Sequence, residues 1–94
     1  MWKSGDIIMI LCEVKPGPFT NERMVRVGPP DNQWVGFSPA SALENPEVKD
    51  GQTRIRAKVV EVTDEYVSVR LPGHAIAASI FRSPIDEVAA GGTL

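Results

Sequence analysis

The residues that could carry out catalysis are few and far apart in this sequence. Its single histidine, His74, follows Pro72-Gly73, and its single cysteine, Cys12, lies inside an apolar run. A nucleophilic or metal site would need further partners beside them, and the sequence offers none at a suitable spacing. The carboxylates of Asp64-Glu65 and Asp86-Glu87 are adjacent, so each pair points apart and forms no acid–base couple. We therefore expect no enzyme, no metal site and no cofactor.

His74 and Cys12 both have interpretations that involve no function. We interpret His74 as a surface residue in a turn, because it follows a Pro-Gly pair. We interpret Cys12 as a buried, unreactive thiol, because its neighbours are apolar. A single cysteine also excludes an intrachain disulfide.

Positive charge is concentrated on one predicted strand. Arg54, Arg56 and Lys58 alternate with apolar residues, and Arg70 and Tyr66 point outward from the segment that follows. Pairing of the two segments would bring the charges to within about 5–8 Å of one another. Such a stripe could attract an acidic protein surface or a nucleic-acid backbone, with Tyr66 available to stack on a base. The alternative is a solvated face, balanced by nearby carboxylates, that discourages edge-to-edge pairing.

The composition favours one small folded domain. The chain has 94 residues, of which 43% are hydrophobic, and a net charge of −2. This length allows a single domain, residues 1–94, and the charge is unlike that of an unspecific nucleic-acid binder. The apolar stretches are too short to span a bilayer, and the first is not followed by a small-residue cleavage site. We therefore expect a cytoplasmic protein without a membrane partner.

Alternation of apolar and polar residues predicts an all-β fold. The expected strands cover residues 6–14, 22–27, 33–37, 53–62, 66–71 and 75–81. Both faces of the first strand are apolar, so it should be covered on both sides, by the other half of the chain or by a second copy in a homodimer. Adjacent Val59 and Val60 shift the apolar phase, which predicts a β-bulge. The segments 53–62 and 66–71 form the clearest hairpin.

Two serine–proline pairs predict short helical turns. The first covers residues 38–43, with Ser38 as the cap and Pro39 at the first helical position. The second covers residues 83–88. The last residues, 89–94, are expected to form a flexible tail.

Residues 3–45 resemble residues 49–88 in the order of their features. Lys3-Ser4-Gly5 and Lys49-Asp50-Gly51 each precede a long strand, and a phenylalanine precedes each serine–proline pair. An internal duplication would explain this order and would predict two pseudo-symmetric sheets packed face to face. The alternative is that short strands and Pro/Gly turns look alike through composition.

The first half also resembles the SH3 domain. Residues 3–11 are similar to the Gly-Asp-hydrophobic strand of that family, and residues 33–43 to its Gly-x-φ-Pro-Ser-x-Tyr-φ stretch with the 3₁₀ turn. The resemblance implies a small SH3-like barrel, beside the alternative of two packed antiparallel sheets. The polyproline groove of the family needs aromatic rings. Here Met24 and Ala42 occupy two of those positions and Pro39 alone matches, so we do not expect polyproline binding.

These observations lead to a non-catalytic binding module, a small subunit or adaptor that contacts another protein. The residues predicted to make the contact are Met24, Trp34, Arg54, Arg56 and Arg70. Trp34 is included because alternation points it away from Val35, which would leave one of the two side chains exposed. The alternative function is single-stranded nucleic-acid binding. The residues predicted for that alternative are Arg54, Arg56, Lys58, Tyr66 and Arg70.

Overall fold

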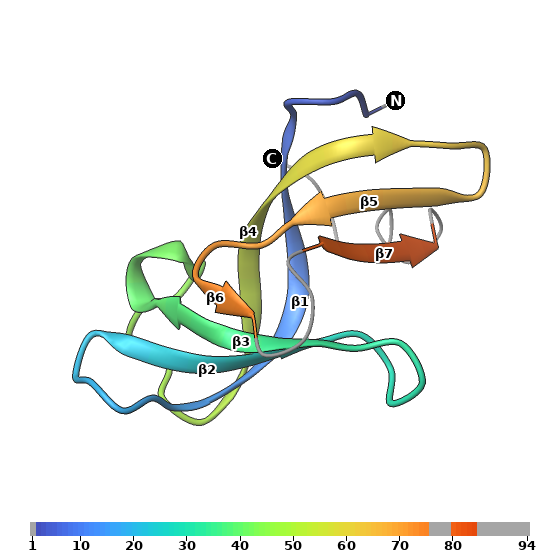
Figure 1. Cartoon of the computed structure of the whole chain (residues 1–94). Helices are drawn as coiled ribbons and strands as arrows, with labels where there is room; N and C mark the ends of the chain where they lie inside the picture. Colours follow the sequence, from blue (N-terminus) through green and yellow to red (C-terminus); the bar gives the residue numbers. More distant parts are fainter. Residues whose placement is uncertain (1, 76–79, 85–94) are drawn as a thin grey trace.

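A computed structural model describes residues 2–75 and 80–84 of the chain (Figure 1). Its strands are β1 Ile7–Pro16, β2 Glu22–Val27, β3 Trp34–Pro39, β4 Gly51–Val62, β5 Tyr66–Arg70, β6 His74–Ala75 and β7 Ile80–Pro84. They form one antiparallel sheet, in the order β6-β3-β2-β1-β4-β5-β7, which coils into a nearly closed barrel. The predicted all-β fold is confirmed, with one continuous sheet in place of two separate ones.

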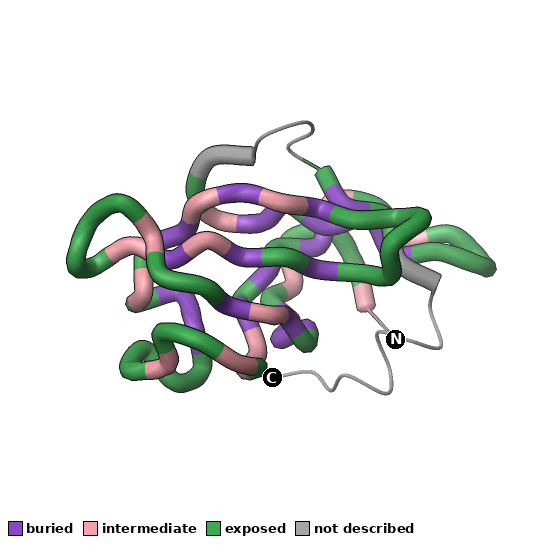
Figure 2. The backbone as a smooth tube through the Cα atoms, turned by 90° about the horizontal axis from the view of Figure 1, so that it is seen from below, coloured by how far each residue is buried: buried purple, intermediate pink, exposed green. Residues whose placement is uncertain are grey.

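The core lies inside the barrel because every second residue of each long strand is apolar. Buried and exposed positions alternate along most of the strands (Figure 2). On β1 the inward residues are buried, namely Ile8, Ile10, Cys12 and Val14. The outward side chains of Ile7 and Leu11 are 38% and 55% exposed. Only Met9 is buried on that outward face. The other half of the chain therefore does not cover Ile7 and Leu11, and cover by a second copy stays a prediction.

The ladder between β1 and β4 lies at the centre of the sheet and joins the two halves of the chain. Residues 7–14 of β1 pair with residues 58–51 of β4. From this ladder, β2 and β3 follow on one side, and β5 and β7 on the other. This strand order favours a duplication of residues 3–45 and 49–88, which stays a prediction. Residues 85–94, including the expected tail, lie outside the described part.

Two turn glycines meet strands of the opposite half. Gly28, after β2, has a φ of +93°, and a Cβ placed there would lie 2.7 Å from the Phe81 ring of β7. Gly73, after β5, has a φ of +95°, and a Cβ would lie 1.9 Å from the Phe37 carbonyl oxygen of β3. Both sites need glycine, for the left-handed backbone and for the close approach. The turn after β2 thus packs against β7 of the second half, and the turn after β5 packs against β3 of the first half.

Several local predictions are corrected by the structure. The first helical turn is a 3₁₀ helix, η1 (Ala40–Ala42), which begins after Pro39 without a side-chain cap, since Ser38 is buried within β3. The second was expected from Ser83, but Ser83 belongs to strand β7. His74 begins β6 and its backbone pairs with that of Phe37, so it lies in a strand and not in a turn.

The predicted β-bulge and hairpin are confirmed. The register between β4 and β5 shifts between Val59 and Glu61. The turn between these strands is held by Thr63, whose Oγ1 accepts a hydrogen bond of 3.0 Å from the backbone N–H of Tyr66. The bulge determines which residues of β4 and β5 face each other.

Candidate binding surface on strands β4 and β5

The basic stripe is positioned by the buried residues between its members. Ile55, Ala57 and Val59 point into the core, so the intervening Arg54, Arg56 and Lys58 lie on the outer face of β4. On β5 the buried Val67 and Val69 similarly leave Arg70 on the outer face. The cations predicted from the sequence therefore share the outer face of β4 and β5.

Lys58 and Arg70 lie directly opposite each other across the β4–β5 ladder. Their outer neighbours in the same row are Ile7 of β1, which pairs with Lys58, and Ile80 of β7, which pairs with Arg70. We call Ile7, Lys58, Arg70 and Ile80 the Lys58 row. Like charges that face each other across a ladder are destabilising, so this arrangement does not serve the fold.

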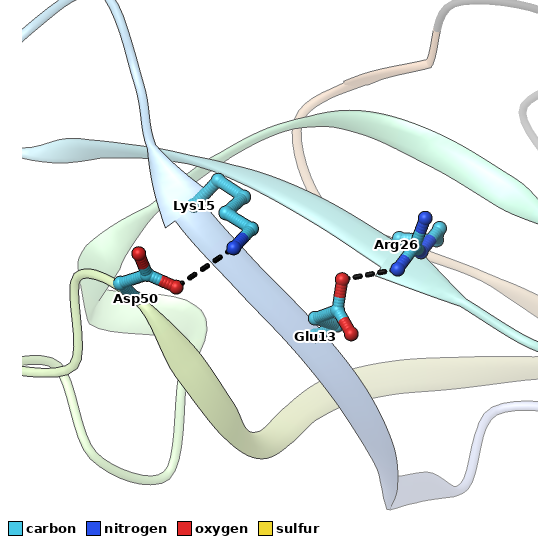
Figure 3. A network of polar contacts seen from close by, with 4 residues as sticks. All are labelled: Glu13, Lys15, Arg26 and Asp50. Carbon is cyan, nitrogen blue, oxygen red and sulfur yellow. Dashed lines mark hydrogen bonds and ion pairs between the residues drawn. The ribbon is translucent and has the colours of Figure 1, made fainter.

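Among the described residues, three other cations of the outer face are paired with carboxylates, whereas Arg56 and Arg82 have no such ion pair. The ion pairs among the described residues are Lys15–Asp50 at 2.9 Å, Arg26–Glu13, and Arg54–Glu44 at 3.8 Å. Figure 3 shows the first two, close to the β1–β2 ladder. Hydrogen bonding to Asp50, and its negative charge, raise the pKa of Lys15. Within residues 2–75 and 80–84, Lys58 and Arg70 have no such carboxylate; Asp86-Glu87 lies outside this part.

The first half of the barrel supplies an internal comparison. Arg26 on β2 lies between two buried valines, as Arg70 lies between buried Val69 and Leu71. Arg26 faces Glu13 across the β1–β2 ladder and forms an ion pair with it. Arg70 faces Lys58 across the β4–β5 ladder. The same local pattern therefore carries a neutralised pair on one side and two cations on the other.

A further cation extends this surface onto β7. The guanidinium carbon of Arg82 lies 5.8 Å from the centre of the Tyr66 ring. Tyr66 is 39% exposed, so its ring is partly open to solvent and partly covered by Arg82. Arg82 was not predicted as a site residue because the sequence does not show that β7 pairs with β5. This cation–π contact uses one face of the ring that the sequence had suggested for base stacking.

No protein-family model, no curated protein and no solved structure matches this chain. The resemblance of its first half to the SH3 domain therefore stays a prediction. Among the described residues, no group of histidine, cysteine or acidic side chains is arranged to hold a metal ion. No helix in the same part of the chain is long and apolar enough to cross a membrane.

Two of the predicted contact residues do not belong to this surface. Trp34 is only 3% exposed and lies in the core, so the expectation that it contacts a partner is wrong. Alternation points Trp34 into the barrel, and Val35 is the residue that faces outward. Met24 is half-buried on the outer face of β2, where it pairs with Lys15 and Phe37. Strand β1 separates Met24 from the cations of β4.

Exposed aliphatic residues accompany the cations, and the sequence reasoning missed them. Ile7 and Leu11 lie opposite Lys58 and Arg54, and Ile80 is 45% exposed beside Arg70. The sequence did show that the outer face of β1 is apolar, but that face was expected to be covered and was not considered as a binding surface. The surface therefore combines positive charge with aliphatic side chains.

Proposed function

We propose that this chain is a cytoplasmic, non-catalytic binding module that recognises an acidic surface of another protein. The binding site is the outer face of β4 and β5, where Arg54, Arg56, Lys58 and Arg70 lie. The observation that supports it best is the direct opposition of Lys58 and Arg70 without a carboxylate among the described residues. A carboxylate from a partner would replace this repulsion with charge-assisted hydrogen bonds.

Aliphatic neighbours favour a protein partner over a nucleic acid. Ile7, Leu11 and Ile80 are exposed next to the cations, and protein interfaces combine apolar side chains with arginine. Proteins that bind single strands use exposed aromatic rings as stacking platforms. At this surface Tyr66 already has Arg82 beside its ring. The net charge of −2 adds no general attraction for phosphates.

Titrations with two labelled probes test this proposal. One probe is a peptide of glutamate and leucine, and the other is an oligothymidine of similar charge, each followed by fluorescence anisotropy at low and moderate salt. We expect the peptide to bind, and Lys58→Gln or Arg70→Gln to weaken binding about tenfold. Arg26→Gln, which removes a cation from the other ladder, should change affinity less than twofold.

Two outcomes of the same titrations would contradict the proposal. Absence of peptide binding at low salt would overturn the proposal. Tighter binding of the oligothymidine, lost in Arg54→Gln and Arg70→Gln and falling steeply with salt, would replace it with nucleic-acid binding.

A further inference from the structure

Strands β4 and β5 cannot accept a partner strand at the Lys58 row. The row lies between paired strands, because Lys58 has neighbours on both β1 and β5, and Arg70 on both β4 and β7. At Lys58 and Arg70 a partner must therefore dock through side chains alone, although Ile80 lies on β7, the last strand in the sheet order. An extended segment would leave its own backbone N–H and C=O groups without ladder partners, whereas an α-helix satisfies them internally. A helix therefore loses fewer hydrogen bonds when it docks on this face.

The spacing of the row also matches a helix. Neighbouring strands lie about 4.8 Å apart, so Lys58 and Arg70 project from backbones with that separation. Residues three or four positions apart on one face of a helix are separated by about 4.5–6 Å along its axis. Two acidic residues one turn apart can therefore each face one cation. Ile7 and Ile80 lie one strand further out on either side, where the helix would place residues one more turn away.

We propose that the partner segment is an amphipathic α-helix with two acidic residues one turn apart, flanked one turn away on each side by apolar residues. The helix lies across the Lys58 row, with its acidic residues on Lys58 and Arg70 and its apolar residues towards Ile7 and Ile80. This inference rests on the proposed function, since it describes the partner of the same surface.

A second copy of this chain fits this face poorly in a symmetric dimer. A two-fold contact brings the same patch of both copies together. It would set Lys58 and Arg70 of one copy against the same cations of the other, and like charges that face each other across an interface oppose binding. A symmetric contact through this face is therefore unfavourable, which favours a different protein as the source of the acidic helix.

Three synthetic peptides of identical composition test the helix and its spacing against the full chain. The matched peptide carries leucine at i and i+10 and glutamate at i+3 and i+7. The shifted peptide carries its glutamates two positions apart, on different sides of the helix. The broken peptide keeps the matched positions but has its proline moved from the end to the centre, which disrupts the helix. Calorimetry gives each affinity for the native chain and for Lys58→Gln, Arg70→Gln and Arg26→Gln, each checked for folding by circular dichroism.

The expected result is that the matched peptide binds about tenfold more tightly than the other two, and that Lys58→Gln and Arg70→Gln remove this difference while Arg26→Gln keeps it. Equal binding of all three peptides, still weakened by Arg70→Gln, would overturn the helix and leave the acidic-partner proposal standing. Absence of binding by every peptide would overturn both.

Discussion

The side-chain amide of Asn32 donates a hydrogen bond of 2.8 Å to the backbone carbonyl of Arg82, 50 residues further along the chain. Asn32 belongs to the turn after β2, and Arg82 to β7, which is not a neighbour of β2 in the sheet. The bond therefore joins strands that the ladders leave apart. It lies beside the contact between Gly28 and the ring of Phe81, so the closure of the barrel depends on this turn.

Gly28→Ala tests the closure of the barrel. The added methyl group would lie 2.2 Å from the Asn32 carbonyl oxygen and 2.7 Å from the Phe81 ring, and would also disfavour the left-handed backbone. Gly5→Ala is the matched control, because Gly5 has a φ of +96° with nothing within 4 Å of its Cβ position. We expect Gly5→Ala to lower the free energy of unfolding by about 1 kcal/mol, and Gly28→Ala by about 2 kcal/mol more. Urea denaturation measures both, and equal losses would contradict the role given to this contact.

Lys58→Glu tests whether the cationic pair is kept at the expense of stability. The variant would place a glutamate opposite Arg70, as Glu13 lies opposite Arg26 in the other ladder. We expect the free energy of unfolding to rise by about 0.5 kcal/mol while binding of the acidic peptide is lost. The reverse exchange, Glu13→Lys, should lower it by a similar amount. A clear loss of stability in Lys58→Glu, measured by thermal unfolding at low salt, would count against this interpretation.

Cys12 should make the fold sensitive to alkaline pH. Burial raises the pKa of its thiol from 9.0 to about 12. Below pH 9 the thiol is neutral in both states, so its contribution to stability is fully present. Between pH 9 and about 12 the unfolded chain ionises first, so stability is lost as the pH rises. Wild type should lose stability more steeply than Cys12→Ala between pH 8 and 10.5.

Thiol labelling gives an independent measure of the same burial. Because the Cys12 side chain is buried and its pKa is raised, native protein at pH 8 should react with a thiol reagent only through unfolding. Urea should restore the rate of a free cysteine. Labelling of the native protein at that full rate would show the thiol to be exposed.

Arg23 should hold two loops together. Arg23 is 5% exposed, and its guanidinium donates hydrogen bonds to backbone carbonyls at the start of β2 and in the segment before β4. The acceptors are Thr20, Glu22, Pro46 and Val48. Arg23→Gln would leave several of these carbonyls without a donor, so we expect a loss of about 2–4 kcal/mol.

The comparison for Arg23 is the exposed arginine of the same strand. Arg26→Gln removes only a surface ion pair and should cost less than about 1 kcal/mol. Hydrogen exchange should show faster exchange of residues 17–21 and 45–49 in Arg23→Gln alone. Similar stability of the two variants would show that the buried guanidinium contributes little.

Local alternation predicted the strands well, because burial of every second side chain leaves its trace in short stretches. It identified the inward residues of β4 and β5, the bulge after Val59 and the outward stripe of cations. It failed at Trp34. Trp34 and Val35 are both apolar and point to opposite faces of β3, so only packing decides which of them is buried. It failed again at β1, where Leu11 looks like a core residue but is exposed.

Relationships between distant segments could not be predicted in this way. The facing of Lys58 and Arg70 depends on the exact register of the ladder, and a shift of one residue would change every pair. Arg23 shares the inward side of β2 with Val25 and Val27, but its acceptors belong to segments without any periodic pattern, so its role was not predicted. The pairing of β7 with β5 also escaped detection, and with it Arg82.

The central position of the β1–β4 ladder has a consequence for synthesis on the ribosome. Domains generally assemble as units during translation, with the amino-terminal part emerging first. Here β1 emerges early, yet its long partner, residues 51–58, is made only after the whole first half. Until then the backbone edge of β1 that pairs with β4 stays open to other chains. A nascent chain interrupted before β4 therefore carries an uncapped apolar strand, and we expect it to need protection from a chaperone.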